Sequence, residues 1–338
     1  MSRKTKSQTP ILLKITEVGQ SIFAEHFVWV LVLLVSFIAY LINPVFYSMT
    51  NLYNLMINSG VLSLLVLGET LILLTGNFDN SIEVTLIFSA MVAGWLTIDH
   101  TYASGLELPT LFGILGMLVV GAVIGAINGY FIGYIGMQSF ITTFATSVVV
   151  SGLGILMTGG SILTPFPDSF TALGRGMIGE LPISGLFVLG LYLLFHIILR
   201  YTYIGRQFYV VGGNKEAARS LGVDVKKTQL VAFVMAGVIA ALGGWILGGR
   251  LNSASGQMSS GQLLLAFGAA VMGGVKLSGG EAKISGILGG VILVASINTL
   301  MNISGMSPYV IQASTGFVIL GAMLIEAIKS RDFLTARN

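Results

Sequence analysis

Residues 200–228 read RYTYIGRQFYVVGGNKEAARSLGVDVKKT, the one long polar interval in an otherwise apolar chain. The interval holds six of the 17 lysine and arginine residues. Asn214 can cap a helix by accepting backbone N–H bonds, and the KEAARSL segment at 215–221 contains strong helix formers. Gly222 suits the left-handed residue that ends a helix. We therefore expect a short capped helix on a basic loop.

This expected helix has two interpretations. Ala217 and Leu221 are four residues apart and share one face. A short helix between membrane spans is suited to docking a cytoplasmic partner. A solvated basic loop with a chance helical turn fits the same residues, so both interpretations stay open on the sequence alone.

Composition places the chain in a membrane. Of its 338 residues, 54% are hydrophobic and 9% are charged, with a mean hydropathy of +0.90, whereas soluble domains carry about 25% charged residues. Backbone groups in lipid must be satisfied internally, and the apolar runs are continuous, which favours helices over a barrel. Cysteine is absent, which excludes disulfides and thiolate chemistry. The net charge of +3 is too small to indicate nucleic-acid binding.

Ten apolar stretches qualify as membrane spans. We expect an all-α polytopic protein with a cytoplasmic or interfacial segment at 1–26, a transmembrane domain at 27–328 and a cytoplasmic tail at 329–338. The eighth stretch would span only about 21 Å of a hydrocarbon core of about 30 Å, so we expect a short or tilted crossing. The stretches are 27–42, 57–75, 83–98, 111–133, 140–158, 184–199, 229–249, 262–275, 284–303 and 308–328.

The distribution of lysine and arginine fixes the expected orientation. With both termini in the cytoplasm, fifteen of the 17 basic residues fall on inner segments. Only Arg175 and Arg250 then lie on the outer side. The basic interval at 200–228 is therefore expected to face the cell interior.

Glycine residues indicate both close packing of helices and breaks in the apolar pattern. Their four-residue spacing through 121–133 predicts close contact between helices. Two glycine-rich breaks, GNFDNS at 76–81 and GGVKLSGG at 273–280, interrupt the apolar pattern in the two halves of the chain. Paired breaks of this kind point to the pathway of a transporter. Two tight cytoplasmic turns are the alternative.

Polar side chains on or beside the expected spans are candidates for a translocation path. Glu69 lies inside the second span, and an ionisable group at that depth usually faces the bundle interior or water. A structural glutamate, protonated or bonded to backbone, is the alternative, just as buried amides can either bind a polar solute or only join helices. The candidates are Glu69, Asn77, Asp79, Asn80, Glu83, Asn128, Asn298 and Asn302.

Enzyme motifs are poorly represented in the sequence. GxxxxGK[ST], HExxH and GxSxG do not occur, so we expect no P-loop, no zincin helix and no nucleophile elbow. The three histidines are scattered, and we assign no metal. We expect no catalysis by this chain.

Three motifs resemble those of the permease subunits of bacterial ABC importers for ribose and related monosaccharides, over about 28–328. GGNKEAARSLGV at 212–223 is similar to the family's GGN-x-x-AAR-x-x-GI segment, and GGVKLSGGEAKISGILGG at 273–290 resembles its GG-x-S-L-x-GG-x-G stretch. GETLILLTGNFDNSIEV at 68–84 stands where the family has G-x-T-x-V-x-x-T-GGIDLSVG, with Asn77, Asn80 and Glu83 as departures. QLLLAFGAA at 262–270 lacks the two acids of the family's ELDAIAA.

The resemblance implies a multi-pass permease subunit in a bacterial inner membrane, paired with a second permease that is identical or paralogous. Two separate ATPase subunits would bind ATP and magnesium, so no cofactor is expected in this chain, and an extracytoplasmic binding protein would deliver a monosaccharide or similar solute. A stand-alone channel or an ion-coupled carrier with Glu69 as its coupling site is the alternative. The residues implied in coupling to the ATPases are Gly213, Asn214, Glu216, Ala217, Ala218, Arg219, Leu221 and Gly222.

Overall fold

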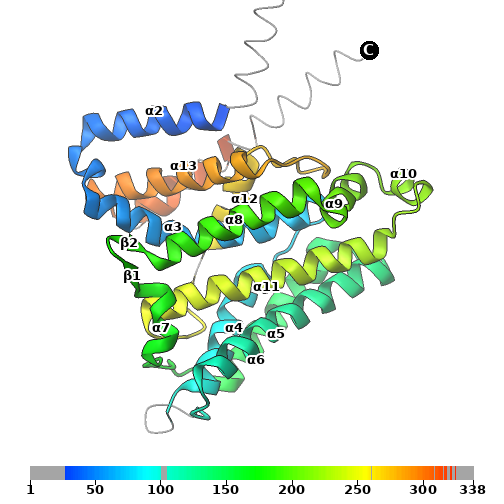
Figure 1. The fold of residues 1–338 in the computed structure, drawn as a ribbon, viewed down its shortest axis with the longest axis horizontal. Helices are drawn as coiled ribbons and strands as arrows, with labels where there is room; N and C mark the ends of the chain where they lie inside the picture. Colours follow the sequence, from blue (N-terminus) through cyan, green and yellow to red (C-terminus); the bar gives the residue numbers. More distant parts are fainter. Residues whose placement is uncertain are drawn as a thin grey trace, which may run out of the picture.

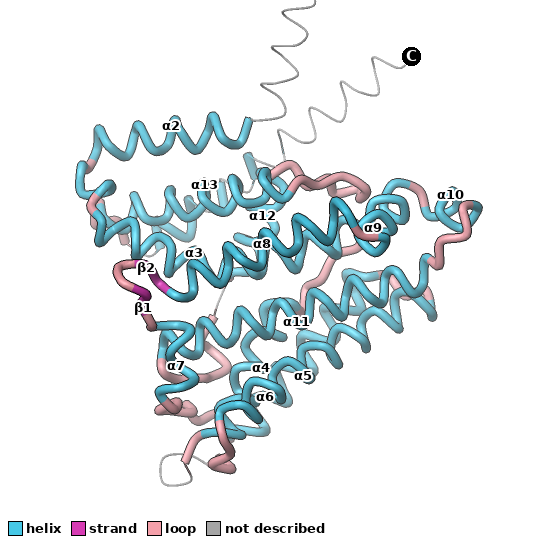
Figure 2. Tube along the Cα trace, in the orientation of Figure 1, coloured by secondary structure: helices cyan, strands magenta, loops and turns pink. Residues whose placement is uncertain are grey.

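The computed structural model describes residues 27–99, 105–259, 261–307, 309–314, 316–317, 320–321 and 324. Long helices lie side by side and form almost the whole of this part of the chain (Figure 1; Figure 2). The elements are α2 Phe27–Ile42, η1 Pro44–Tyr47, α3 Met49–Leu74, α4 Ile82–Thr97, α5 Thr110–Tyr130, η2 Phe131–Ile135, α6 Ser139–Thr158, α7 Asp168–Arg175, β1 Met177–Ile178, β2 Leu181–Pro182, α8 Ile183–Tyr201, α9 Tyr203–Gly213, α10 Lys215–Ser220, α11 Val225–Leu251, α12 Gln262–Met272 and α13 Ile284–Ile303.

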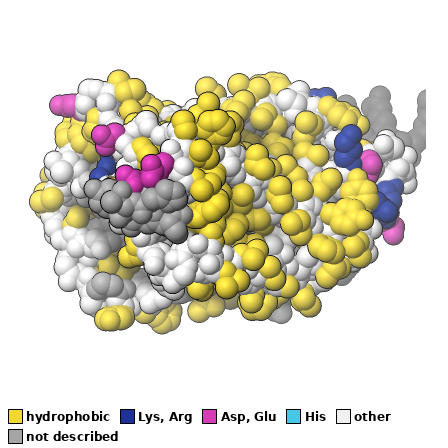
Figure 3. All heavy atoms as spheres, turned by 90° about the horizontal axis from the view of Figure 1, so that it is seen from below, with side chains coloured by type: hydrophobic (Ala, Val, Ile, Leu, Met, Phe, Trp, Pro, Cys, Tyr) yellow, Lys and Arg dark blue, Asp and Glu magenta, His cyan; other side chains and the backbone are white. Residues whose placement is uncertain are grey.

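The surface of the bundle matches a lipid environment. Six described helices are long and apolar enough to cross a membrane: α3, α5 with η2, α6, α8, α11 and α13. Large apolar side chains stand on the surface, and Leu156 on α6 is 80% exposed, which is costly in water. Figure 3 shows charged side chains at the two ends of one face and a broad, mostly hydrophobic band between them. The chain is therefore a multi-pass, all-α membrane protein, and its described part contains one minimal β-hairpin.

Most expected spans coincide with described helices. The helices α2, α4, α6 and α13 begin and end within one residue of the stretches expected for them. Of the last expected span, 308–328, part lies outside the described residues, and those described from 309 to 324 are helical. The expected segments 1–26 and 329–338 lie outside the described residues.

The structure corrects the extent of three segments. The helix α3 begins at Met49 rather than near 57, because the Ser48 side chain accepts the Asn51 N–H and caps a polar first half that hydropathy alone excludes. The interval 200–228 holds a second helix, α9, in addition to the expected short one. The helix α12 has 11 residues, about 16 Å, and does not extend to 275.

The core forms around α3 and α11, and the glycine spacing in α5 has the expected consequence. From Gly60 to Leu74 every residue of α3 is buried. A Cβ added at Gly121 or Gly125 would overlap the backbone of Gly237 or Phe233 on α11. The two helices therefore pack backbone to backbone, as small-residue faces permit in lipid.

The two ends of the bundle carry different structures. Helices α9 and α10 lie at one end, whereas α7 and the β1–β2 hairpin lie at the other (Figure 1). The Arg175 side chain at the end of α7 donates through Nε to the Arg250 carbonyl oxygen at 2.8 Å. The two basic residues assigned to the outer side are thus neighbours, at the end remote from α10.

Candidate functional site

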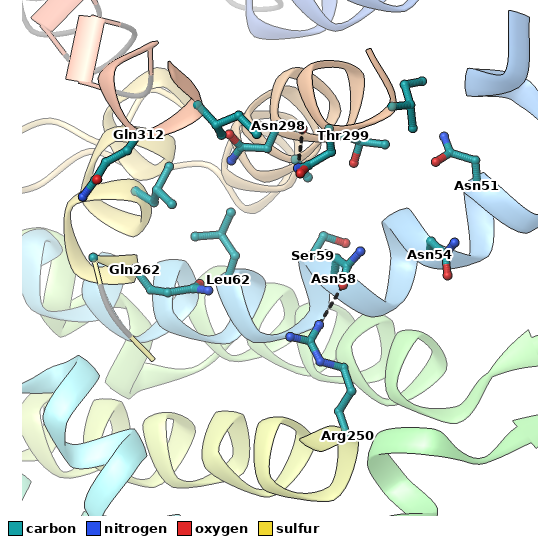
Figure 4. A pocket seen from close by; sticks show the side chains of 16 residues that line it. Asn51, Asn54, Asn58, Ser59, Leu62, Arg250, Gln262, Asn298, Thr299 and Gln312 are labelled. Carbon is teal, nitrogen blue, oxygen red and sulfur yellow. Dashed lines mark hydrogen bonds between the residues drawn. The ribbon is translucent and has the colours of Figure 1, made fainter. Parts of the chain in front are cut away.

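A polar cavity of about 770 Å³ lies between α3, α13 and the beginning of α12 (Figure 4). Its volume is in the range of about 300–1,000 Å³ that small-molecule sites occupy. Among the described residues, the lining contains seven side-chain amides and one arginine, and no aspartate or glutamate. Its residues are Asn51, Asn54, Asn58, Ser59, Leu62, Arg250, Gly261, Gln262, Leu265, Ala295, Asn298, Thr299, Asn302, Ile303, Ile311 and Gln312.

Two helix faces supply most of the amides. On α3, Asn51, Asn54 and Asn58 recur at helical spacing and point to one side. On α13, Asn298 and Asn302 are four residues apart, and the Asn302 side chain donates to the Asn298 carbonyl oxygen at 2.8 Å. The two stripes face each other across the cavity (Figure 4). Because an amide both donates and accepts hydrogen bonds, each wall can bind a hydroxyl group as a donor or as an acceptor.

Arg250 marks which end of the bundle the cavity occupies. Its Nη1 donates to the Asn58 Oδ1 at 2.8 Å. Arg250 is in the last turn of α11, whereas α10 closely precedes the first turn of that helix. A helix of 27 residues is about 40 Å long, so the cavity and α10 lie toward opposite ends of the bundle.

The sequence located only one wall of this cavity. Asn298 and Asn302, two of the expected path residues, line it. Asn51, Asn54 and Asn58 are not among the expected residues, although their helical spacing is visible in the sequence. Asn51 and Asn54 precede the apolar run at 57–75, and Asn58 is at its edge, so a search restricted to the apolar centre of a span passes over them.

Three other path candidates join a buried hydrogen-bond chain away from the cavity. Glu69 Oε1 accepts the Asp79 N–H at 3.3 Å, and Asp79 Oδ1 accepts both the Ser81 N–H at 2.7 Å and its hydroxyl at 2.6 Å. Asn128 Nδ2 donates to Ser81 Oγ at 2.8 Å, and Thr146 Oγ1 donates to Asn128 Oδ1 at 2.7 Å. This chain links α3, α5 and α6 through the first glycine-rich break.

Two further candidates in that break make different contacts, Asn77 through its side chain and Asn80 through its backbone N–H. The Asn77 side chain donates to Thr75, to the carbonyl oxygen at 3.2 Å and to Oγ1 at 2.9 Å. The Asn80 N–H donates to Thr143 Oγ1 at 2.9 Å. Glu69 differs, because its Oε2 is buried and has no hydrogen-bond partner in the part of the chain that the structure describes. A role of these residues in the path stays a prediction.

Glu83, the remaining candidate, connects two helices that are distant in sequence. Its carboxylate accepts hydrogen bonds from Ser259 and from the first two residues of α12, Gln262 and Leu263. Glu83 does not line the cavity, but Gln262 does. Sequence alone gives no sign of this contact, since the partners are about 180 residues apart.

The expected helix in the basic interval is confirmed as α10. Asn214 Oδ1 accepts the N–H groups of Glu216 and Ala217 at 2.9 and 3.0 Å, and Gly222 has a φ of +77°. Ala218 is buried against α9 and α11, while Ala217 and Leu221 are exposed, Leu221 by 75%. Partial burial and the charge of Arg219 lower the pKa of Lys215. The helix therefore presents a small apolar face ringed by charged groups.

Both glycine-rich breaks meet at the base of α10. The Gly280 N–H donates to the Leu74 carbonyl oxygen at 3.0 Å. A Cβ at Gly212 would overlap that same carbonyl oxygen and the Gly280 nitrogen, so only glycine fits there. Tyr209 on α9 donates its hydroxyl to the Ala282 carbonyl oxygen at 3.0 Å. The last turn of α9 thus contacts the ends of both breaks.

Among the described residues, no three His, Cys, Asp or Glu side chains gather in a group that fits a metal ion.

Comparison with known proteins gives one consistent result. A family model described as branched-chain amino acid transport system / permease component matches residues 51–328. The ribose import permease protein RbsC of Bacillus subtilis is 35% identical over 305 residues, which cover 89% of this chain and 91% of that protein. RbsC of Haemophilus influenzae is 28% identical over 314 residues, covering 92% of this chain and 95% of that protein.

A relative named for a different sugar is nearly as similar. The galactose/methyl galactoside import permease protein MglC of Escherichia coli is 30% identical over 322 residues, covering 90% of this chain and 94% of that protein. No solved structure matches the chain at a comparable level of significance.

Proposed function

We propose, from the premise that this chain belongs to the branched-chain amino acid transport system / permease component family, that it is the membrane permease subunit of an ABC importer for a monosaccharide. Relatives named for ribose and for galactose import support a sugar as the solute. ATP hydrolysis then belongs to a separate subunit, and this chain contributes the path and its gating.

The amide-lined cavity is the observation that carries the solute class. Sugar hydroxyls need partners that both donate and accept, and seven side-chain amides line the cavity. The described part of that lining holds no aspartate or glutamate, which disfavours a cationic solute. Asn58 on α3 and Asn298 on α13 contribute to facing walls (Figure 4), so a solute of several hydroxyls can bind both helices at once.

The finer architecture is part of the proposal. We infer ten spans, with both termini in the cytoplasm and the protein in a bacterial inner membrane, because this arrangement places fifteen of 17 basic residues inside. Two permease subunits, identical or paralogous, would form the complete path. Two ATPase subunits would bind at the α10 end, and an extracytoplasmic binding protein would dock at the α7 end.

The contacts at the base of α10 suggest how force would reach the path. Gly212 on α9 touches the Leu74 carbonyl at the end of α3 and the Gly280 backbone in the second break. The helix α3 carries one wall of the cavity, and the second break joins α12 to α13, which carry other parts of the lining. Movement of α10 by the ATPases would therefore be transmitted to both walls through backbone contacts.

The test is uptake by proteoliposomes that contain this chain, its cognate ATPase and its cognate binding protein. Radiolabelled D-ribose and D-galactose are the probes. Uptake is measured with and without ATP on the side of the membrane where the ATPase is bound. ATP-dependent accumulation that requires the binding protein supports the proposal. Accumulation without ATP contradicts it.

One observation favours the alternative of an ion-coupled carrier. Glu69 Oε2 is buried without a hydrogen-bond partner among the described residues, and ionisable groups at membrane depth are often functional. A carrier coupled through Glu69 would drive uptake by a proton or ion gradient in the absence of the ATPase. The same proteoliposomes, lacking the ATPase and given a pH step or a membrane potential, separate the two mechanisms.

A further inference from the structure

The carboxylate of Glu83 bridges the first turn of α4 and the beginning of α12. Its Oε1 accepts from Ser259 Oγ and from the Gln262 N–H, each at 2.9 Å, and its Oε2 accepts from the Leu263 N–H at 3.1 Å. Both oxygens are therefore engaged by the segment that leads into α12. The bond partners lie 176 to 180 residues further along the chain.

The helix α12 depends on this outside acceptor. The first N–H groups of a helix have no partner within it, and the residue before α12 is Gly261, which provides no side-chain cap. Glu83 supplies both the missing acceptor and a negative charge at the positive end of the helix dipole. Because Glu83 is itself in the first turn of α4, its charge is near the positive ends of two helices.

The end of α12 that Glu83 holds is part of the cavity wall. Gly261, Gln262 and Leu265 all line the cavity. The Gln262 residue uses its backbone N–H to bind Glu83, while its side chain is one of the seven amides of the lining (Figure 4). A second contact joins α12 to the break that precedes α4, since the Phe78 and Phe267 rings meet edge to face with their centroids 5.1 Å apart.

We propose that Glu83 is a positioning residue for the solute: it fixes the first turn of α12, holds the Gln262 amide in the cavity wall and so sets the affinity of the cavity. This proposal rests on the proposed function only in naming a sugar as the solute. The positioning itself is a statement about α12 and can be measured without any solute. Glu83 acts through Gln262 and need not touch the sugar.

The first experiment measures the position of α12 directly. The chain contains no cysteine, so Leu265→Cys gives a single reporter in the cavity wall. Its rate of reaction with a membrane-impermeant maleimide is compared in full-length protein with and without Glu83→Ala or Glu83→Gln. We expect a change of about three- to tenfold for Glu83→Ala, since three hydrogen bonds are lost, and a smaller change for Glu83→Gln, which keeps an acceptor oxygen.

The matched control is Glu281→Gln. Glu281 is an exposed acid whose described partner is Lys276, so its neutralisation is expected to leave the Leu265→Cys reaction rate unchanged. Equal rates with and without Glu83→Ala, in protein that elutes as a single species from a sizing column, would overturn the proposal. A change of equal size with Glu281→Gln would also overturn it, because the reporter would then be sensing charge in general.

The second experiment connects position to affinity. D-ribose and D-galactose are titrated to find the concentration of each that halves the rate at which Leu265→Cys reacts with the maleimide. This half-protecting concentration is then compared in Glu83→Ala, Gln262→Ala and the double variant. We expect a rise of about three- to tenfold in each single variant and no further rise in the double, because both remove the same amide from the wall. Additive rises would contradict action through Gln262.

The two experiments fail independently. If neither sugar protects Leu265→Cys in the otherwise unaltered protein, the assignment of the cavity to a monosaccharide is wrong. The labelling rates then still decide whether Glu83 positions α12. If the sugars protect but Glu83→Ala changes neither the rate nor the half-protecting concentration, the cavity assignment stands and the positioning role is wrong.

Discussion

The Gly280 N–H donates a 3.0 Å hydrogen bond to the carbonyl oxygen of Leu74, although the two residues are more than 200 positions apart. Leu74 ends α3, and Gly280 belongs to the break between α12 and α13. Gly212 fits against both, which a Cβ would prevent. The two halves of the bundle are therefore joined by backbone contacts at the last turn of α9, which leads into α10.

Replacement of Gly212 by alanine tests this junction. The added Cβ overlaps backbone atoms of Leu74 and Gly280 that cannot move independently, so we expect a loss of about 1–3 kcal/mol or more in stability. Gly190→Ala on α8 is the control, because no atom lies within 4 Å of its added Cβ, and helix propensity predicts a gain of up to about 1 kcal/mol. Thermal unfolding in detergent measures both. A Gly212→Ala protein as stable as the unaltered chain would contradict the close packing.

Charge reversal at Arg219 tests the docking surface on α10. Arg219 is exposed beside Ala217 and Leu221, so Arg219→Glu is expected to abolish co-purification of the ATPase and ATP-dependent uptake together. Arg175→Glu, at the α7 end, is expected to leave ATPase association unchanged. If Arg219→Glu retains both association and uptake, α10 is not the docking element.

The reactivity of Lys215 should depend on pH in a defined direction. Partial burial and the nearby Arg219 charge lower the pKa of Lys215, so more of its amine is neutral and nucleophilic at a given pH than in an ordinary lysine. Acylation should therefore reach half its maximal rate at a lower pH than acylation of a lysine in a short peptide of residues 213–217. Arg219→Gln removes one cause of the lowered pKa of Lys215 and should move the acylation profile to higher pH. Mass spectrometry of the 215-containing peptide gives the rates, and an unshifted profile would contradict the local electrostatics.

Substitutions in both cavity walls test whether α3 and α13 together bind the solute. Asn58→Leu and Asn298→Leu keep side chains of similar size but remove hydrogen-bonding groups, so each is expected to reduce ATP-dependent D-ribose uptake by about tenfold. Gln257→Leu removes an exposed amide in the α11–α12 connection, outside the cavity lining, and should leave uptake near its original rate. A uniform response of all three variants would argue against a solute site between α3 and α13.

The sequence predicts the parts of this molecule that depend on local pattern. Apolar runs locate α2 and α13, and the cap at Asn214 with the left-handed Gly222 locates α10, because each signal is contained within a few residues. The stripe Asn51, Asn54 and Asn58 is local as well, but it contradicts the hydropathy on which span prediction depends. This stripe is recognisable as a cavity wall only in the folded structure, where Asn298 lies on the opposite wall.

Contacts between distant segments explain what the sequence could not provide. Glu83 as an acceptor for α12 and Leu74 as an acceptor for Gly280 both depend on the packing of the two halves. Neither partner can be chosen from the sequence, because each break offers many donors and acceptors. Residues that were singled out for polarity, such as Glu69 and Asn128, prove to share one buried hydrogen-bond chain, through Asp79 and Ser81.

The sidedness of the two ends is the prediction on which the proposed mechanism depends most. The natural absence of cysteine allows single reporters at exposed positions, Asn54→Cys beside the cavity and Ala217→Cys on α10. In intact cells, an impermeant maleimide is expected to label Asn54→Cys and to leave Ala217→Cys unmodified until the membrane is opened. Fifteen of 17 basic residues support that orientation. Labelling of Ala217→Cys from outside would remove α10 from the reach of any cytoplasmic ATPase and, with it, the proposed coupling through Gly212.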